Sequence, residues 1–214
     1  MKITILNSSE SHPINPWLRR WLEENSSEHE INLVRQKKEL NGGDILFLIS
    51  CSEIVNAEDR RKYEKALVIH ASDLPKGRGW SPHIWEVANG AKEITVSLLE
   101  ASDKVDSGDI WHKVKLEIPS TALYDEINEL LFASELSLMD FAVKHFSTIS
   151  PRPQDHRISP TYWPRRSPKD SELDITQSIG EQFDLIRVCD SNRFPAYFYR
   201  NGKKYLLKIE AVDD

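Results

Sequence analysis

One stretch of the sequence decides the fold, and it reads Ala66-Leu67-Val68-Ile69-His70-Ala71-Ser72-Asp73-Leu74-Pro75-Lys76-Gly77-Arg78-Gly79-Trp80-Ser81-Pro82. It begins with a short apolar run, which is typical of a strand buried on both faces of a parallel sheet. His70 stands at the end of that run, and a loop stiffened by Pro75 and Pro82 follows it. Because ligands bind outside the carboxyl ends of the strands in such sheets, the position of His70 nominates it as a functional residue.

Outward from this stretch, strands alternate with helices along the chain. Further apolar runs predict strands over residues 2–6, 31–34, 44–49, 94–99 and 110–116, and a hairpin that turns at Asn201-Gly202. Helices are expected over residues 15–22, 57–65, 82–89 and 175–188, and a long one follows Ser120. Asn15 and Ser120 are suited to cap the first and the long helix. The alternation predicts an α/β fold with a Rossmann-like, doubly wound and mostly parallel sheet.

The composition changes at Ser150, where a stretch rich in proline and arginine runs to Pro168 without a period. Such a stretch reads as a long surface loop, and long ordered loops often carry function. We therefore expect a catalytic domain over residues 1–150. Residues 151–214 would form an extension of loop, helix and hairpin that completes the binding site of one substrate, called the acceptor below.

The overall charge bears on the partners of the protein. The formal net charge is −6, which argues against tight binding to a nucleic acid polymer. Neither Cys51 nor Cys189 lies in a Cys-x-x-Cys pair, so no structural zinc site is expected. The start of the chain offers no signal peptide or membrane span, which favours a cytoplasmic protein. The oligomeric state, monomer or dimer, is left open by the sequence.

Two motifs carry a resemblance to a known family. His70, Ser72, Leu74, Pro75, Arg78, Gly79 and Pro82 match in register the pattern Asn-x-His-x-Ser-x-Leu-Pro-x-x-Arg-Gly-x-x-Pro, and Asp106-Ser107-Gly108-Asp109-Ile110 matches Asp-[Ser/Thr]-Gly-Asp-Ile. Both patterns are those of the folate-dependent N-formyltransferases, which the chain resembles. One position departs from the pattern, because Val68 stands where the family has asparagine.

The resemblance implies that His70 and Asp106 are catalytic and that 10-formyltetrahydrofolate is the cosubstrate, with no metal. Taken alone, His70 could be a structural residue at a strand end, and Asp106 could be ordinary turn chemistry. The stiff loop, the neighbouring carboxylate and the motif match together favour catalysis. By the same resemblance, the folate would be bound by Ser50, Cys51, Ser52, Ile54, Leu74 and Asp103.

The acceptor class follows from a third motif. Thr161-Tyr162-Trp163-Pro164-Arg165-Arg166-Ser167-Pro168-Lys169-Asp170 is similar to a segment of the sugar-nucleotide N-formyltransferases. The resemblance implies that the acceptor is a nucleotide-linked amino-dideoxy sugar, with a pseudaminic-acid-type precursor favoured. Its predicted binding residues are Arg78, Trp80, Tyr162, Arg165, Arg166 and Arg187. Two alternatives stay open, namely a carrier-bound aminoacyl group as acceptor, and a module that binds folate or sugar nucleotide with little or no turnover.

Overall fold

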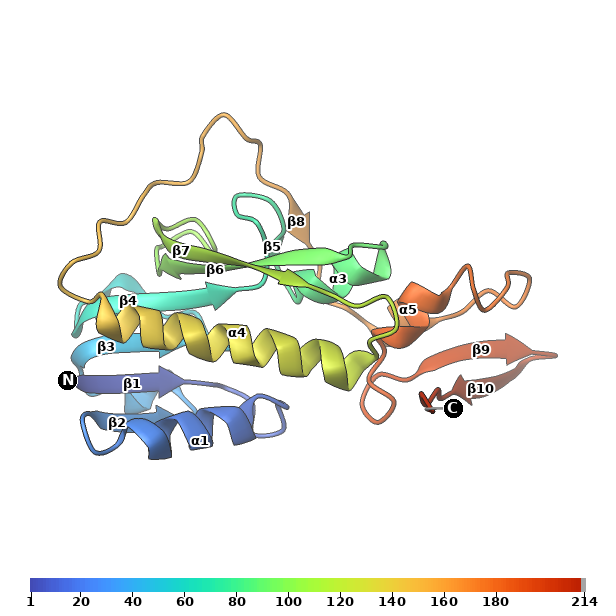
Figure 1. Ribbon diagram of the computed structural model, residues 1–214, viewed down its shortest axis with the longest axis horizontal. Helices are drawn as coiled ribbons and strands as arrows, with labels where there is room; N and C mark the ends of the chain where they lie inside the picture. The colour runs from blue at the N-terminus through green and yellow to red at the C-terminus, as the bar shows by residue number, and fades with distance from the viewer. Residues whose placement is uncertain (213–214) are drawn as a thin grey trace.

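The computed structural model describes residues 1–212 and is built around a six-stranded sheet (Figure 1). The strand order is β2-β1-β3-β4-β6-β7. The strands are β1 (Lys2–Leu6), β2 (Glu30–Val34), β3 (Gly43–Leu48), β4 (Tyr63–His70), β6 (Glu93–Glu100) and β7 (Ile110–Glu117). The first four run parallel, whereas β6 is antiparallel to both β4 and β7. The predicted mostly parallel α/β sheet is therefore confirmed.

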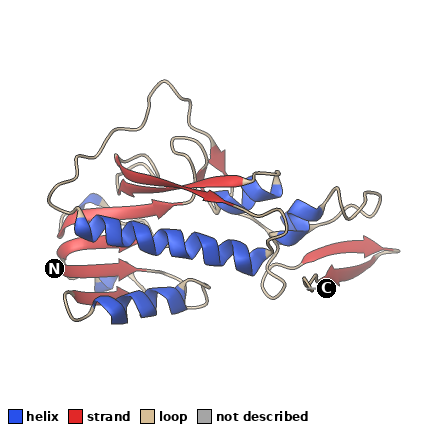
Figure 2. Cartoon of the chain, viewed as in Figure 1, coloured by secondary structure: helices blue, strands red, loops and turns tan. Residues whose placement is uncertain are grey.

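Helices cover the sheet, and Figure 2 shows the longest of them, α4, lying over it with its axis close to the strand direction. The helices are α1 (Asn15–Asn25), α2 (Ala57–Arg60), α3 (Pro82–Ala88), α4 (Tyr124–Lys144) and α5 (Phe183–Arg187), with short 3-10 turns η1 (Lys37–Glu39) and η2 (Pro168–Ser171). Among residues 1–212, no helix combines the length and the apolar character that crossing a bilayer requires.

Strand β4 shows why the deciding stretch is apolar without alternation. Leu67 and Ile69 belong to the main core cluster, which α1 and α4 help to form, whereas Ala66 packs against a second cluster with Leu46 and Tyr63. Because successive side chains of a strand point to opposite faces, both faces of β4 are covered. Burying one such aliphatic side chain contributes about 1.5–3 kcal/mol, so the continuous run anchors the sheet.

The C-terminal extension carries a hairpin that lies at one end of the molecule (Figure 1). Its hairpin consists of β9 (Ala196–Arg200) and β10 (Lys203–Leu207), which pair antiparallel. Asn201 and Gly202 have φ of 49° and 75°. Positive φ at both central residues is the requirement of the tight hairpin turn that Asn-Gly predicts, so this expectation is confirmed.

Two expected helix caps are wrong. Asn15 lies inside the first turn of α1, where its amide donates to the carbonyls of Ser9, Glu10 and His12 and so fixes the preceding loop. Helix α4 begins at Tyr124 rather than next to Ser120, and the carboxylate of Glu126 accepts the backbone N–H of Leu123 to close its first turn.

Two expected helices are also too long. The helix predicted over residues 57–65 ends at Arg60, because Tyr63 is buried in β4 with its hydroxyl donating to Thr4. The helix predicted over residues 175–188 is confined to Phe183–Arg187. Upstream of it, the side chains of Asp174 and Ser178 bond to nearby backbone and side-chain groups, and such local bonds compete with a helix.

Candidate active site

His70 is the last residue of β4, and its imidazole is held between a loop and a turn. Nε2 lies 2.8 Å from the carbonyl oxygen of Gly77, and Nδ1 lies 3.6 Å from Oδ1 of Asp106. A carbonyl oxygen can only accept, so Nε2 carries the proton of this hydrogen bond. The side chains of His70 and Asp106 are 9% and 7% exposed. Nδ1 is thus the ring atom that shares its surroundings with the carboxylate.

Asp106 follows β6 in a turn where its own φ is 53°, in the left-handed region. Its Oδ2 accepts the backbone N–H of Gly79 at 2.9 Å, so each carboxylate oxygen faces a different part of the site. Gly79 has φ of 99°, and a Cβ there would lie 2.4 Å from the carbonyl oxygen of Trp163. The structure therefore brings the two predicted catalytic side chains together, and a glycine that no other residue can replace without strain helps to hold them.

The loop after residue 150 returns to this point through a short parallel pair, β5 (Arg78–Gly79) with β8 (Tyr162–Trp163). Thr161 contributes its carbonyl to the N–H of Arg78 and its hydroxyl to the N–H of Gly77. Strand β5 thus contacts Asp106 on one side and the predicted acceptor loop on the other.

Arg78 does not face the solvent. It is 6% exposed, and its guanidinium donates to Oε1 of Gln154 at 2.7 Å and to the hydroxyl of Tyr162 at 3.3 Å. The hydrogen bond from Arg78 is the largest cause that lowers the pKa of Tyr162. Its contacts make Arg78 a link inside the protein between the acceptor loop and the catalytic turn.

Aromatic and arginine side chains, most of them exposed, belong to β5, β8 and the residues next to these strands. We call Trp80, Tyr162, Trp163 and Arg165 the Trp-Arg surface. Trp80 and Tyr162 are 43% and 56% exposed, and the guanidinium of Arg165 lies 5.0 Å from the ring centre of Trp80. Trp163 stacks on Trp85 at 5.4 Å. Cation–π and stacking contacts of this kind preorganise flat surfaces for ring-bearing ligands.

The two other predicted acceptor arginines are held by the protein itself. Arg166 lies 5.3 Å from the ring centre of Trp85 and donates to the carbonyl of Asp170. The side chain of Arg187 is 2% exposed, and it donates to Asp184 and to the carbonyls of Pro119 and Ala122. Arg187 thus joins α5 to the segment before α4, and its contact with an acceptor stays a prediction.

The predicted folate residues lie on two neighbouring segments that Arg60 connects. Its guanidinium donates to the carbonyl of Val55 at 2.6 Å and pairs with Asp103. Ile54 is 68% exposed, and Ser52 bonds to Ser8 of the loop after β1. Ser50 is exposed with φ of 47°, and burial raises the pKa of the Cys51 thiol, so that it stays protonated. Val68 is partly buried on β4 and, two residues before His70, lies on the same face of the strand.

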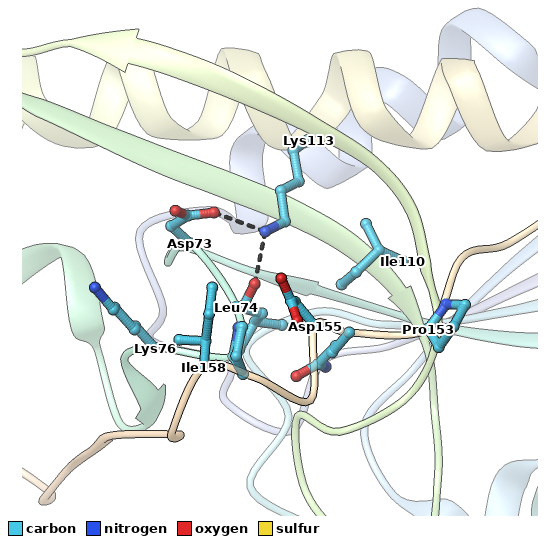
Figure 3. Close-up of a pocket in the computed structure, with 10 residues that line it drawn as sticks. Asp73, Leu74, Lys76, Ile110, Lys113, Pro153, Asp155 and Ile158 are labelled. Carbon is cyan, nitrogen blue, oxygen red and sulfur yellow. Dashed lines mark hydrogen bonds and ion pairs between the residues drawn. The ribbon is translucent and has the colours of Figure 1, made fainter.

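Leu74, the remaining predicted folate residue, is placed in different surroundings. It is 2% exposed and lines a cavity of about 270 Å³ (Figure 3). The lining residues are Asp73, Leu74, Pro75, Lys76, Ile110, Lys113, Pro153, Gln154, Asp155 and Ile158. Nζ of Lys113 donates to Asp73 and to the carbonyl of Leu74, both at 2.6 Å, and so ties the loop to β7. Neither His70 nor Asp106 lines this cavity.

Sequence reasoning did not single out His83 and His12, whose pKa values are shifted, or Gln154, which contacts the turn that carries Asp106. Burial is the main cause that lowers the pKa of His83 to about 3, and the charges of His12, His70 and Arg166 lower it further. Burial also lowers the pKa of His12 to about 4. The third is Gln154, which is buried against the catalytic turn. Isolated residues in loops or first turns have no periodicity, so nothing in the sequence could have identified them.

In the part of the chain that the structure describes, no group of three or more His, Cys, Asp or Glu side chains could hold a metal ion.

A buried His-Asp pair at the edge of a mostly parallel sheet, where α/β proteins bind their ligands, is the arrangement of an α/β enzyme. The family model described as formyl transferase matches residues 2–140. The chain therefore belongs to the formyl transferase family, which confirms the predicted family.

Curated and solved relatives agree with the family. A methionyl-tRNA formyltransferase from Protochlamydia amoebophila is 30% identical over 172 residues, which cover 78% of this chain and 53% of that protein. The chain thus spans about half the length of this curated relative.

Three solved structures share the fold at lower identity. A methionyl-tRNA formyltransferase from Clostridium thermocellum is 21% identical with a TM-score of 0.80, covering 100% of this chain and 94% of that one. HypX from Aquifex aeolicus in complex with tetrahydrofolic acid is 23% identical with a TM-score of 0.76, covering 97% and 37%. A sugar N-formyltransferase from a Shewanella species is 16% identical with a TM-score of 0.73, covering 100% and 99%.

Proposed function

We propose that this protein transfers the formyl group of 10-formyltetrahydrofolate to the amine of a nucleotide-linked amino-dideoxy sugar, with a pseudaminic-acid-type precursor favoured. The observation that carries the proposal is the double role of β5. One edge of this strand bonds to Asp106, and the other pairs with β8 beneath the Trp-Arg surface. An acceptor that rests on this surface is therefore next to a buried acid–base pair.

The proposed reaction exchanges one C–N bond for another and moves two protons. The acceptor amine attacks the formyl carbon, a new C–N bond forms, and the bond from that carbon to the folate nitrogen breaks. The attacking amine gives up a proton, and the leaving nitrogen takes one. Nε2 of His70 is engaged with Gly77, so Nδ1 is the ring atom that exchanges the proton. Asp106, beside Nδ1, stabilises the imidazolium that results.

The loop 50–55 and the turn 101–106 fit a folate. Val68 and the exposed Ile54 offer apolar surface to a flat pterin ring, and Arg60 holds the two segments together. When bound, the folate would supply the activated formyl group. The tetrahydrofolate complex of HypX, which has the same fold, is consistent with this cosubstrate.

The Trp-Arg surface suits a nucleotide. Trp80 and Tyr162 can stack on a base, and the exposed Arg165 can donate two parallel hydrogen bonds to a diphosphate. Arg166 is partly engaged with Asp170, so Arg165 is the residue freer to bind phosphate. The similarity to a sugar N-formyltransferase supports the same acceptor class.

A second candidate acceptor is methionyl-tRNA, which the names of the curated relatives favour. The net charge of −6 weighs against it, because binding a polyanion relies on a basic surface. A carrier-bound aminoacyl group is the third candidate, and binding without turnover is the fourth.

The test supplies 10-formyltetrahydrofolate with three acceptors in turn, namely a panel of nucleotide amino-sugars, methionyl-tRNA and an aminoacyl carrier protein. We expect turnover with a nucleotide amino-sugar. Turnover with methionyl-tRNA or the carrier protein alone would overturn the sugar assignment, and turnover with none of the three would leave binding as the function.

A pair of arginine variants then locates the acceptor. Arg165→Ala should raise the acceptor KM about tenfold, since a charge-assisted hydrogen bond contributes about 1.5–3 kcal/mol, and should leave the folate KM unchanged. Arg157→Ala is the matched control, because Arg157 lies on the same loop and its side chain is 90% exposed but pairs with Asp155. A rise in the folate KM instead would place the two substrates the other way round.

A further inference from the structure

Gln154 is a buried glutamine whose whole side-chain amide is engaged at the catalytic turn. It is 7% exposed. Its Nε2 donates to the carbonyl of Asp106 at 2.9 Å and to that of Gly108 at 3.0 Å. Its Oε1 accepts from Arg78 at 2.7 Å. A glutamine amide has two N–H donors and one carbonyl acceptor group, and here all three are used.

The backbone turn that Gln154 contacts, residues 106–108, is conformationally restricted. Asp106 is in the left-handed region with φ of 53°, a conformation that is unfavourable for a non-glycine residue. Gly108 packs so closely that a Cβ would lie 1.8 Å from the carbonyl of Glu100. Two hydrogen bonds, one on each side of Ser107, therefore fix the backbone that aims the Asp106 carboxylate at His70.

We propose that Gln154 is a positioning residue of the reaction, which acts by holding the Asp106 carboxylate toward His70. This inference rests on the proposed function, since it assigns Asp106 a role in formyl transfer. Gln154 comes from the segment that also forms the acceptor loop, so the loop that binds the acceptor supplies part of the support for the acid–base pair.

Two substitutions separate the amide donors from the contact with Arg78. Gln154→Glu keeps an oxygen that can pair with Arg78 but loses both N–H donors, and places oxygens against the carbonyls of Asp106 and Gly108. Gln154→Met fills a similar volume and loses every polar contact. If the donors position Asp106, both variants lower kcat at least tenfold, while the KM of each substrate changes less than twofold.

The matched control is Gln182→Met. Gln182 also spans a loop, since its Nε2 donates to the carbonyl of Asp174 and its Oε1 accepts the N–H of the same residue. It lies in the C-terminal extension, and kcat should stay within twofold of wild type. Retention of full activity by Gln154→Glu, with loss only in Gln154→Met, would show that pairing with Arg78 is what matters and would overturn the proposal.

A double-mutant cycle adds a readout that a purely structural role would not move. If Gln154 acts through Asp106, Gln154→Met costs at least tenfold in the wild-type background and less than twofold in the Asp106→Asn background. Equal losses in both backgrounds would mean that Gln154 only stabilises the fold.

Wild-type turnover, measured first, separates this inference from the proposed function. If the wild type transfers formyl and the Gln154 variants keep its kcat, the positioning role is wrong and the function stands. If the wild type transfers formyl to no acceptor, the function fails. Amide hydrogen exchange of residues 106–109 then tests the positioning contact by itself, and unchanged exchange in Gln154→Met would overturn it.

Discussion

The two ring nitrogens of His70 have different partners. One of them holds the ring in place, and the other faces the carboxylate. Nε2 is tied to the backbone of the loop that follows β4, so the ring cannot rotate without breaking a buried hydrogen bond. A buried polar group left without a partner costs about 1–3 kcal/mol. The loop therefore fixes the orientation in which Nδ1 faces Asp106.

Removing either member of the pair should abolish most of the rate and little of the stability. We expect His70→Ala and Asp106→Asn each to lower kcat by about 10²–10⁴, the range for losing a positioned acid–base group. Melting temperature and circular dichroism serve as the control for folding. A variant that turns over within threefold of wild type, with the fold intact, would remove that residue from the mechanism.

Val68 offers the converse test, because the family pattern has asparagine there. Val68→Asn should raise kcat, since an added donor for the oxyanion can contribute on the order of 10²–10³ in rate. The side chain is partly buried on the same face as His70, so the new amide can reach the same substrate. Val68→Leu, which adds no donor, is the control. An unchanged or lower rate in Val68→Asn, with an unchanged melting temperature, would mean that another group already holds the oxyanion.

The sequence motifs predicted the two side chains of the buried pair but not the groups that hold them. His70 and Asp106 were found because they sit in patterns with fixed spacing. Gln154 and the carbonyl of Gly77 act through backbone geometry or a single loop side chain, which leave no pattern. Nothing in the sequence indicated that Arg187, a predicted acceptor residue, donates to the carbonyls of Pro119 and Ala122.

Among the elements, α4 carries a carboxyl group where an apolar residue would be expected. Glu135 is 7% exposed, and its Oε2 is buried without a hydrogen-bond partner in the described structure. Burial raises its pKa to about 8, from an ordinary value of 4.5. The folded state therefore binds this proton more tightly than the unfolded state does.

The sign of the resulting pH dependence follows directly. The stabilising protonated form is fully present below about pH 4.5, and its contribution is lost as the pH rises toward about 8. Glu135→Gln cannot ionise and so does not lose this stability as the pH rises. The unfolding free energy of the variant minus that of wild type should therefore increase by roughly 1 kcal/mol per pH unit across that window. Denaturant unfolding at pH 5, 6.5 and 8 measures this, with the exposed Glu129→Gln on the same helix as control. A constant difference between Glu135→Gln and wild type would contradict the raised pKa.

The elements that the sequence predicted well are those whose pattern reports burial on one or both faces, such as β4 and the Asn-Gly hairpin. The errors cluster at helix ends. Tyr63 was placed in a helix because its neighbours are polar, and only its contact with Thr4 across the sheet reveals the strand. Such contacts between residues far apart in the sequence override local propensity.

For the whole molecule, the exposed part of the acceptor loop predicts where a protease cuts. The Arg157 side chain is 90% exposed, and residues 156–162 are all exposed. Trypsin should cleave first after Arg157. The nicked protein should keep its kcat within twofold, because Gln154 lies before the cut and the β8 pairing lies after it. Mass spectrometry of a time course and an assay of the nicked protein test this, with Arg157→Gln as the resistant control. Early loss of activity would show that the cut segment itself contacts substrate.

The segments that hold the His70–Asp106 pair lie far apart in the sequence, so the ribosome synthesises them at different times. Gln154 bonds to a residue 48 positions earlier, and Thr161 bonds to one 84 positions earlier. At a synthesis rate of ~5–20 residues per second, the acceptor loop emerges several seconds after the strand that carries His70. A nascent chain can thus form its sheet while His70 and Asp106 still lack this support, so the pair reaches its final geometry only after residue 161 has left the ribosome.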